Sequence, residues 1–224
     1  MAINWQTFST DPTQNAALYN AALYSFFIKV ETQNHVTPDY SAYDDESGLG
    51  NVTIGVGFNL NDANVRNSFF NALGLVENDP RLSPFLQTKE NQYIQQLLDA
   101  INARDANQFN TIMAQRAADT SLTSVLGALT FPLDHNEVQN IFNTIIPTYE
   151  AAVNTWLTGI PDSQERIALV SLAYNAKVGS NGLPTTLGSK LMADIQNGDR
   201  AEAWYQIRYS SYVRMVSRCR ENIW

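Results

Sequence analysis

The sequence predicts an α+β fold, in which a small antiparallel sheet forms one lobe, mostly helical residues form a larger lobe, and a cleft separates them. Three observations support this prediction. Apolar residues recur at helical spacing before residue 31, the helical period disappears between residues 32 and 61, and helix-capping signatures return from residue 62. We expect a single domain over residues 1–224, with an N-terminal helical segment to about residue 30, a β lobe over 31–61 and a helical lobe over 62–224.

The first helix is predicted to begin at Asp11, because an N-cap acid precedes Pro12 and Gln14 has the spacing of a capping box. Apolar residues then repeat every three or four positions as far as Val30. The helix therefore carries Glu31 at its C-terminal end.

Residues 32–61 are predicted to form a small antiparallel sheet with tight turns. Tyrosine and β-branched residues form short runs, which glycine and proline interrupt. These turn residues are Pro38, Gly48, Gly50, Gly55 and Gly57.

The chain beyond residue 61 is predicted to be almost wholly helical. One helix should run from Asp62 to Leu73 with Gly74 as its terminator, and a second should open at Thr88 and continue through Ile101. Capping-box spacing predicts three further helices, with the boxes at Asp134 to Glu137, Asp162 to Glu165 and Asp199 to Glu202.

Composition and charge limit the classes of function. The 224 residues are 44% hydrophobic, which suffices for a packed core, and a net charge of −8 argues against binding to a phosphate backbone. Cys219 is the only cysteine and there are two histidines, so we expect no intramolecular disulfide, no metal and no cofactor. No apolar run reaches membrane-spanning length, and the N-terminus lacks the features of a Sec signal peptide. A monomer is expected.

Two carboxylates and a hydroxyl in one segment suggest hydrolysis of a glycoside, which requires one protonated and one ionised acid. Glu31 follows an apolar helix face, where partial desolvation and the helix C-terminus would keep it protonated. Asp45 lies in a predicted turn and suits the ionised role, with Asp44 and then Asp39 as alternatives. Thr53 could hold an attacking water.

Other residues could contact a sugar chain. Gly55 and Gly57 alternate along a predicted strand, so a glycan could approach the backbone closely there. Hydrogen bonds to sugar hydroxyl or acetamido groups could come from Asn175 and from Thr185 or Thr186. Each of these polar residues also suits an ordinary capping role, and the sequence leaves both interpretations open.

Several motifs together resemble the phage-type lysozymes of glycoside hydrolase family 24 and the related muramidase domain of pesticin. The resemblance covers most of residues 20–224. Its motifs are Ala42-Tyr43-Asp44-Asp45, Gly48, Val52-Thr53-Ile54-Gly55-Val56-Gly57, Leu172-Ala173-Tyr174-Asn175, Thr185-Thr186-Leu187, Asn197-Gly198-Asp199 and the closing run 213–224. The chain departs from the family by a longer spacing between Glu31 and Asp45, by Phe58 in place of the usual histidine, and by Asn59, where pesticin-like enzymes often carry aspartate.

The resemblance implies a lysozyme-like fold and cleavage of the β-1,4 bond between N-acetylmuramic acid and N-acetylglucosamine in peptidoglycan. It assigns catalysis to Glu31, Asp45 and Thr53, and substrate binding to Gly55, Asn59, Asn175, Thr185 and Thr186. If Thr53 holds a water on the sugar face opposite Glu31, the reaction should invert, with the carboxylates roughly 6.5–9.5 Å apart. A catalytically silent module that binds glycan or protein, and a chitinase-like activity, are the alternatives.

The resemblance also implies the partners and the place of action. Peptidoglycan glycan strands are the expected partner, and an immunity or inhibitor protein is a further candidate. Because no Sec signal is recognised, the protein should be made in the cytoplasm. It would then reach the wall of a host or target cell through a holin-type lesion, a virion or a contact-dependent secretion machine.

Overall fold

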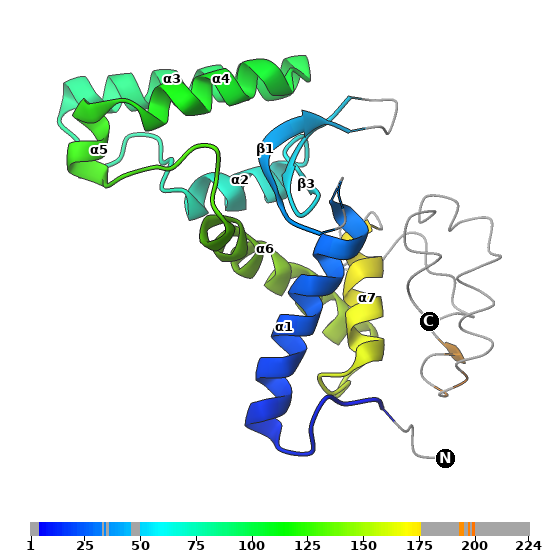
Figure 1. Cartoon of the computed structure of the whole chain (residues 1–224). Coiled ribbons are helices and arrows are strands. Elements are labelled where there is room, and N and C mark those ends of the chain that lie inside the picture. Colours follow the sequence, from blue (N-terminus) through cyan, green and yellow to red (C-terminus); the bar gives the residue numbers. More distant parts are fainter. Residues whose placement is uncertain are drawn as a thin grey trace. The chain divides into compact units, whose positions relative to one another are not determined.

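The computed structural model describes residues 5–32, 34, 36–45 and 50–175, together with residues 193, 194, 197 and 199 (Figure 1). This part of the chain has seven helices and one three-stranded antiparallel sheet, which confirms the α+β prediction. The elements are α1 (Pro12–Glu31), β1 (Asp39–Asp44), β2 (Val52–Gly55), β3 (Phe58–Asn59), α2 (Ala63–Ala72), α3 (Pro84–Ala103), α4 (Ala106–Ala117), α5 (Thr120–Leu126), α6 (His135–Trp156) and α7 (Gln164–Asn175).

The chain divides into two compact units. We call residues 31–145 the sheet unit, since it contains β1–β3 with α2–α5 and the first half of α6. Residues 1–30 and 146–224 form the terminal unit, whose described helices are α1, the second half of α6, and α7. In the described part of the chain, no helix combines the length and the apolar character that crossing a membrane requires.

The sheet has the order β1-β2-β3, so β2 is its central strand. Thr53 on β2 is opposite Tyr43 on β1 and Asn59 on β3. The β1–β2 pairing is irregular between Asp39 and Tyr43, because Asp39 is opposite Gly55 and the two strands advance by different numbers of residues. All four residues of β2 are buried, as expected for a strand that is covered on both faces.

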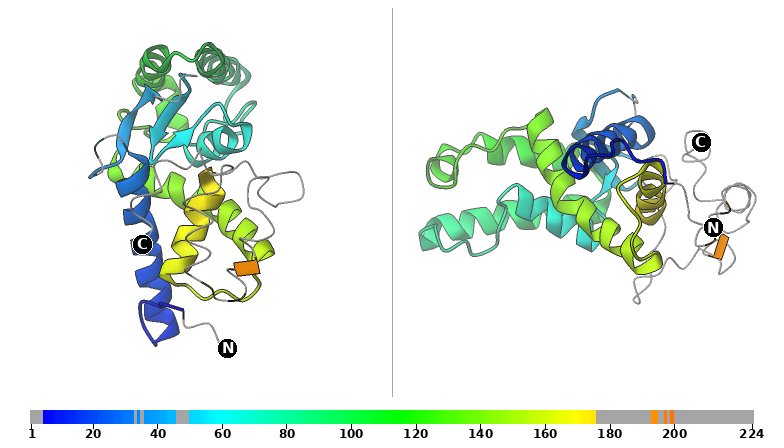
Figure 2. Two further views of the ribbon diagram at one scale, coloured as in Figure 1. Left: turned by 90° about the vertical axis from the view of Figure 1, so that its right-hand side faces the viewer. Right: turned by 90° about the horizontal axis from the view of Figure 1, so that it is seen from below.

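Helices α3 and α4 lie side by side, as the two further views also show (Figure 2). Helix α3 begins with Pro84 at its first position, after the N-cap Ser83, whose hydroxyl accepts from the Leu86 N–H. The prediction that Thr88 opens this helix is therefore wrong. The Thr88 hydroxyl instead donates to the Pro84 carbonyl at 3.0 Å, a bond within the helix.

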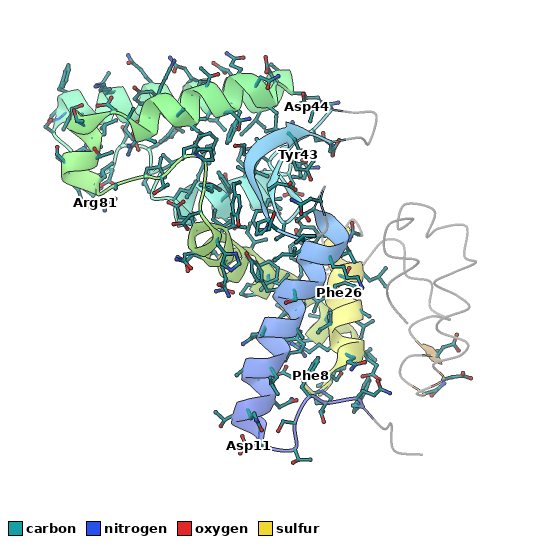
Figure 3. The ribbon with its side chains drawn as sticks, in the orientation of Figure 1. Phe8, Asp11, Phe26, Tyr43, Asp44 and Arg81 are labelled. Atoms are coloured by element: carbon teal, nitrogen blue, oxygen red, sulfur yellow. The ribbon has the colours of Figure 1, made fainter. Side chains whose placement is uncertain are left out.

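Helix α4 covers the outer edge of β1. The Asn110 side chain accepts from the Ala42 N–H and donates to the Ala42 carbonyl, both at 2.8 Å. One turn earlier on α4, the Ala106 N–H donates to the carboxylate of Asp44, which lies at the end of β1 (Figure 3). An edge strand with unpaired backbone groups can pair with other chains, and these side chains occupy part of that edge.

Replacing Asn110 with alanine should lower the free energy of unfolding by about 1–3 kcal/mol, because the buried backbone N–H and C=O of Ala42 each lose a hydrogen bond. Urea denaturation followed by circular dichroism would measure the change. Asn107→Ala is the matched control, since it makes the same change at an exposed position of α4. Equal stability of the two variants would contradict this account of the β1 edge.

The core of the sheet unit lies between the sheet and its helices. Phe69 of α2 and Phe109 of α4 are fully buried, and their rings are 6.4 Å apart. From the sheet and its turn come Val52, Ile54, Val56, Phe58 and Leu60, each no more than 1% exposed. The apolar residues of segment 52–60, which we call the motif segment, therefore anchor strands β2 and β3 and the turn between them in this core.

The terminal unit contains a polar network in which an arginine also lies over an aromatic ring. The buried Tyr19 hydroxyl of α1 donates to Glu150 at 2.8 Å, and burial, followed by the charge of Glu150, raises the pKa of Tyr19. Arg166 of α7 donates to Asn154 at 2.9 Å and lies over the Tyr19 ring. These contacts join α1, α6 and α7 within the unit.

The predicted helix starts have mixed outcomes. Asp11 and Asp62 accept from N–H groups of their first turns, which confirms both as caps. Asp134 and Glu137 form a reciprocal capping box, with both bonds at 2.8 Å.

The cap of α7 is Ser163 rather than the predicted Asp162, since the Ser163 hydroxyl accepts from the Arg166 N–H. Glu165, the predicted partner of Asp162, accepts from the Gln6 N–H instead. The helix predicted after Asp199 lies outside the described residues.

Candidate active site

Glu31 lies beside the turn that joins β2 to β3. A methyl group added at Gly57 would be 3.0 Å from the Cβ of Glu31, and 3.4 Å from both its carbonyl oxygen and its Oε2. Glu31, the last residue of α1, is half-buried. The helix end and the glycine turn thus bring one carboxyl oxygen next to the backbone of the motif segment.

Gly55, at the end of β2, and Gly57, in the following turn, are required for different reasons. Both have left-handed backbone conformations, with φ of +71° at Gly55 and +78° at Gly57. A Cβ at Gly55 would lie 2.6 Å from the Phe58 ring, so this glycine makes room for a buried aromatic residue. Gly57 makes room for Glu31. The prediction that Gly55 lies open to a glycan therefore has a competing structural explanation.

Replacing Gly57 with alanine should destabilise the sheet unit more than the roughly 1–2 kcal/mol that left-handed backbone costs an L-residue, because the new methyl group also presses against Glu31. Gly74→Ala is the matched control, since Gly74 has φ of +69° and nothing lies within 4 Å of its added methyl group. Chemical denaturation of both variants would separate the cost of the left-handed backbone from the cost of the contact with Glu31. If the two variants are equally destabilised, Glu31 does not crowd the turn.

Asp45 closes the loop between β1 and β2 by pairing with Asn51. Its Oδ1 accepts from the Asn51 backbone N–H at 3.2 Å, and its Oδ2 accepts from the Asn51 side-chain amide at 3.1 Å. The Asp45 N–H donates to the Asn51 carbonyl at 2.9 Å. Both carboxylate oxygens thus act as acceptors, as those of an ionised carboxylate must.

Thr53 lies on β2, with its side chain 4% exposed. Its hydroxyl donates to the Asn51 carbonyl at 3.4 Å, which is long for such a bond. The same carbonyl accepts from the Asp45 N–H, so Asn51 contacts both Asp45 and Thr53. Sequence reasoning missed Asn51, although it is an amide residue directly after a glycine turn, a typical place for side-chain to backbone bonds.

Asp44, the alternative to Asp45, and Asn59 of β3 each form hydrogen bonds with nearby residues. Asp44 is exposed and accepts from the N-terminus of α4 at 3.1 Å, which explains it as part of the β1 edge. Asn59 accepts from the Asn61 N–H at 2.9 Å, and Asn61 in turn accepts from the Val52 N–H. Asp39 is half-buried at the start of β1. Asp45 contacts Asn51, the residue that Thr53 also contacts.

The remaining predicted residues lie in the terminal unit or outside the described residues. Asn175 is the last residue of α7, in the terminal unit, and its amide donates to the Ser171 carbonyl at 3.0 Å. Thr185 and Thr186 lie outside the described residues. Within the described ranges, no three His, Cys, Asp or Glu residues gather as a metal-binding group.

The sheet unit thus contains two arrangements: Glu31 lies beside the Gly57 turn, and Asp45 and Thr53 both contact Asn51. An acid at a helix end, a carboxylate after one strand and a hydroxyl on the next strand are groups that could act in hydrolysis. Comparison with known proteins gave no relative: no protein-family model, no curated protein and no solved structure matches the chain.

Proposed function

We propose that this protein is a muramidase with a lysozyme-like fold, which cleaves the β-1,4 bond between N-acetylmuramic acid and N-acetylglucosamine in peptidoglycan. The substrate comes from the resemblance to phage-type lysozymes. One observation carries the proposal: the carboxyl group of Glu31 lies against Gly57, within the same motif segment as Thr53. In the sequence these residues are separated by the whole of β1 and its following loop.

The half-buried position of Glu31 supports the role of general acid. A partly desolvated carboxyl group at a helix C-terminus favours its neutral form, which can give a proton to the leaving oxygen. The paired carboxylate of Asp45 supports the complementary role, since it accepts two hydrogen bonds from Asn51. When two carboxyl groups have different surroundings, this difference is the usual basis for assigning one as the general acid and the other as the base.

The proposed reaction is a single displacement with inversion. The oxygen of a water molecule forms a bond to the anomeric carbon while the bond from that carbon to the glycosidic oxygen breaks. The proton of Glu31 passes to the leaving oxygen, and Asp45 accepts a proton from the attacking water. Thr53 orients that water. Glu31 is then ionised, Asp45 is protonated, and solvent exchange restores both.

The proposal extends to the biological setting. The protein would be made in the cytoplasm and would act on the cell wall of a host or target cell, as an endolysin, a bacteriocin or an injected effector. Glycan strands are its partner in each case. An immunity or inhibitor protein would be needed wherever the producing cell is itself exposed to the enzyme.

A glycan-binding module without hydrolysis is the second candidate. It is favoured by the double contact between Asp45 and Asn51, which a loop-closing role alone would explain. This candidate predicts that the protein sediments with insoluble peptidoglycan and releases no sugar ends. Measuring both sedimentation and the release of sugar ends in one sample therefore distinguishes hydrolysis from binding without turnover.

The test is the release of reducing ends from purified peptidoglycan and, in parallel, from N-acetylchitooligosaccharides. We expect release from peptidoglycan at a rate proportional to protein concentration, with little release from the chitin fragments. Faster release from the chitin fragments would support a chitinase-like enzyme instead. Retention on peptidoglycan with no release from either substrate would overturn the proposal in favour of the binding module.

A further inference from the structure

We propose that Arg66 of α2 binds a carboxylate on the stem peptides of peptidoglycan. The inference rests on the proposed function and adds a substrate group for which the sequence predicts no binding residue. Arg66 is half-buried near the start of α2. It belongs to the sheet unit, as Glu31 does.

The guanidinium of Arg66 has no acidic partner in the described part of the chain. Its recorded hydrogen bond runs from Nη1 to the Leu60 carbonyl at 3.1 Å. The nearest acid along the helix, Asp62, is its N-cap, and Oδ1 of that residue accepts from the N–H groups of Asn64 and Val65. Other described cations do have acidic partners, namely Arg81 with Asp79, Lys89 with Asp119, Arg116 with Glu90 and Arg166 with Glu150 and Asp162. The charge of Arg66 is therefore available to an anionic ligand.

The donors that remain on Arg66 suit a carboxylate. A guanidinium carries five N–H donors in one plane, and one of them is bonded to Leu60. Nε is buried with no hydrogen-bond partner among the described residues. Nη2 also has no partner there, but it is not buried. The hydrogens that remain on Nη1 and Nη2 form a fork, which a carboxylate binds with both of its oxygens.

The bond to Leu60 places this fork beside the sheet. Leu60 follows β3, and its N–H donates to the Val52 carbonyl of β2 at 2.9 Å. Leu60 is three residues after Gly57, so their backbones lie within about 11 Å of each other. Glu31 lies beside Gly57, so a group bound at Arg66 is in the same unit but away from the bond that is cut. Arg66 should therefore contribute to substrate binding rather than to the chemical step.

The chemistry of the substrate identifies the carboxylate. In peptidoglycan, N-acetylmuramic acid carries a peptide that is joined through an amide bond, and this peptide has free carboxylates. Chitin has none. The net charge of −8 repels an acidic polymer at long range, so its acidic groups need a local cation on the protein. A carboxylate site at Arg66 would also favour peptidoglycan over chitin.

The test measures binding by sedimentation with insoluble peptidoglycan that has been freed of phosphate-containing polymers. The Glu31→Gln protein, which we call the parent, leaves the glycan intact. Carbodiimide and ammonia convert the stem-peptide carboxylates of a second sample to amides. Arg66→Gln in the parent should weaken binding to native peptidoglycan by about 10-fold or more, and amidation should weaken binding of the parent by a similar factor. On amidated peptidoglycan the two proteins should bind equally.

Two controls make the test specific. Arg104→Gln removes the same charge at the exposed C-cap of α3, and it should bind like the parent. Glycan strands from which an amidase has removed the peptides carry only the lactyl carboxylate of muramic acid, and Arg66→Gln should have little effect on binding to them. An equal effect on these strands would assign the ligand to the lactyl group and overturn the stem-peptide assignment.

The outcomes separate this inference from the proposed function. If the parent binds native and amidated peptidoglycan equally, the inference is wrong, and this comparison needs no variant of Arg66. The inference also fails if a folded Arg66→Gln variant binds native peptidoglycan as tightly as the parent, even when the wild-type protein releases reducing ends. A wild-type protein that releases no reducing ends, while its binding depends on Arg66 and on the carboxylates, would overturn the muramidase proposal and retain the carboxylate site.

Discussion

Replacing Glu31 with glutamine is expected to lower kcat for peptidoglycan hydrolysis by about 10²- to 10⁴-fold, the contribution that a positioned acid typically makes. Glutamine has almost the same shape but no proton to give to the leaving oxygen. The change should leave the fold intact, because the amide keeps the contact with Gly57.

The rate of reducing-end release from purified peptidoglycan measures this effect. Glu77→Gln is the matched control, since Glu77 is exposed and lies in the segment between α2 and α3. This variant should keep wild-type activity. A folded Glu31→Gln variant whose kcat stays within a few-fold of wild type would exclude Glu31 as the general acid.

The largest effect on stability is expected at the buried ion pair between Glu90 of α3 and Arg116 of α4. The two residues are 0% and 2% exposed, and the Arg116 guanidinium donates to both oxygens of Glu90 through Nε and Nη2. Its Nη1 is buried with no hydrogen-bond partner among the described residues. Glu90→Gln leaves a buried positive charge unpaired, which should lower the free energy of unfolding by about 3–5 kcal/mol.

A variant with an apolar pair in place of the ion pair tests whether the loss of stability comes from the unpaired charge. The double variant Glu90→Leu with Arg116→Met removes both charges, so it should be more stable than Glu90→Gln. Urea denaturation of the two variants and wild type would give the three free energies. If the double variant has a lower free energy of unfolding than Glu90→Gln, this prediction is wrong. The ion pair would then stabilise the fold by more than the cost of burying its two charges.

Much of the fold could be predicted because its signals are local. The cap at Asp11, the cap at Asp62 and the box at Asp134 each depend on residues within one helical turn. The start of α3 lies before the predicted Thr88, although its signal is also local, because Ser83 caps the helix and Pro84 occupies its first position. At α7 the aspartate and the serine next to it compete as caps, and Ser163 is the one whose side chain bonds the first turn.

The candidate site was only partly predictable. Glu31 and the glycine turn follow from a helix that ends just before a strand, together with a motif whose glycines must leave room. The role of Asn51 depends on how the β1–β2 loop closes, which brings positions 45 and 51 together through three hydrogen bonds. No sequence pattern of alternation or capping specifies that pairing. The same holds for Asn110, whose partner Ala42 is 68 positions away.

The most direct test of the muramidase proposal is the identity of the sugar at each newly formed reducing end. Purified peptidoglycan would be digested with the protein, the products reduced with borohydride, and the fragments analysed by mass spectrometry. Cleavage of the proposed bond leaves N-acetylmuramic acid at the reducing end, so the fragments should end in its reduced alcohol. Fragments that end in reduced N-acetylglucosamine, or a digest with no new reduced ends, would contradict the proposal.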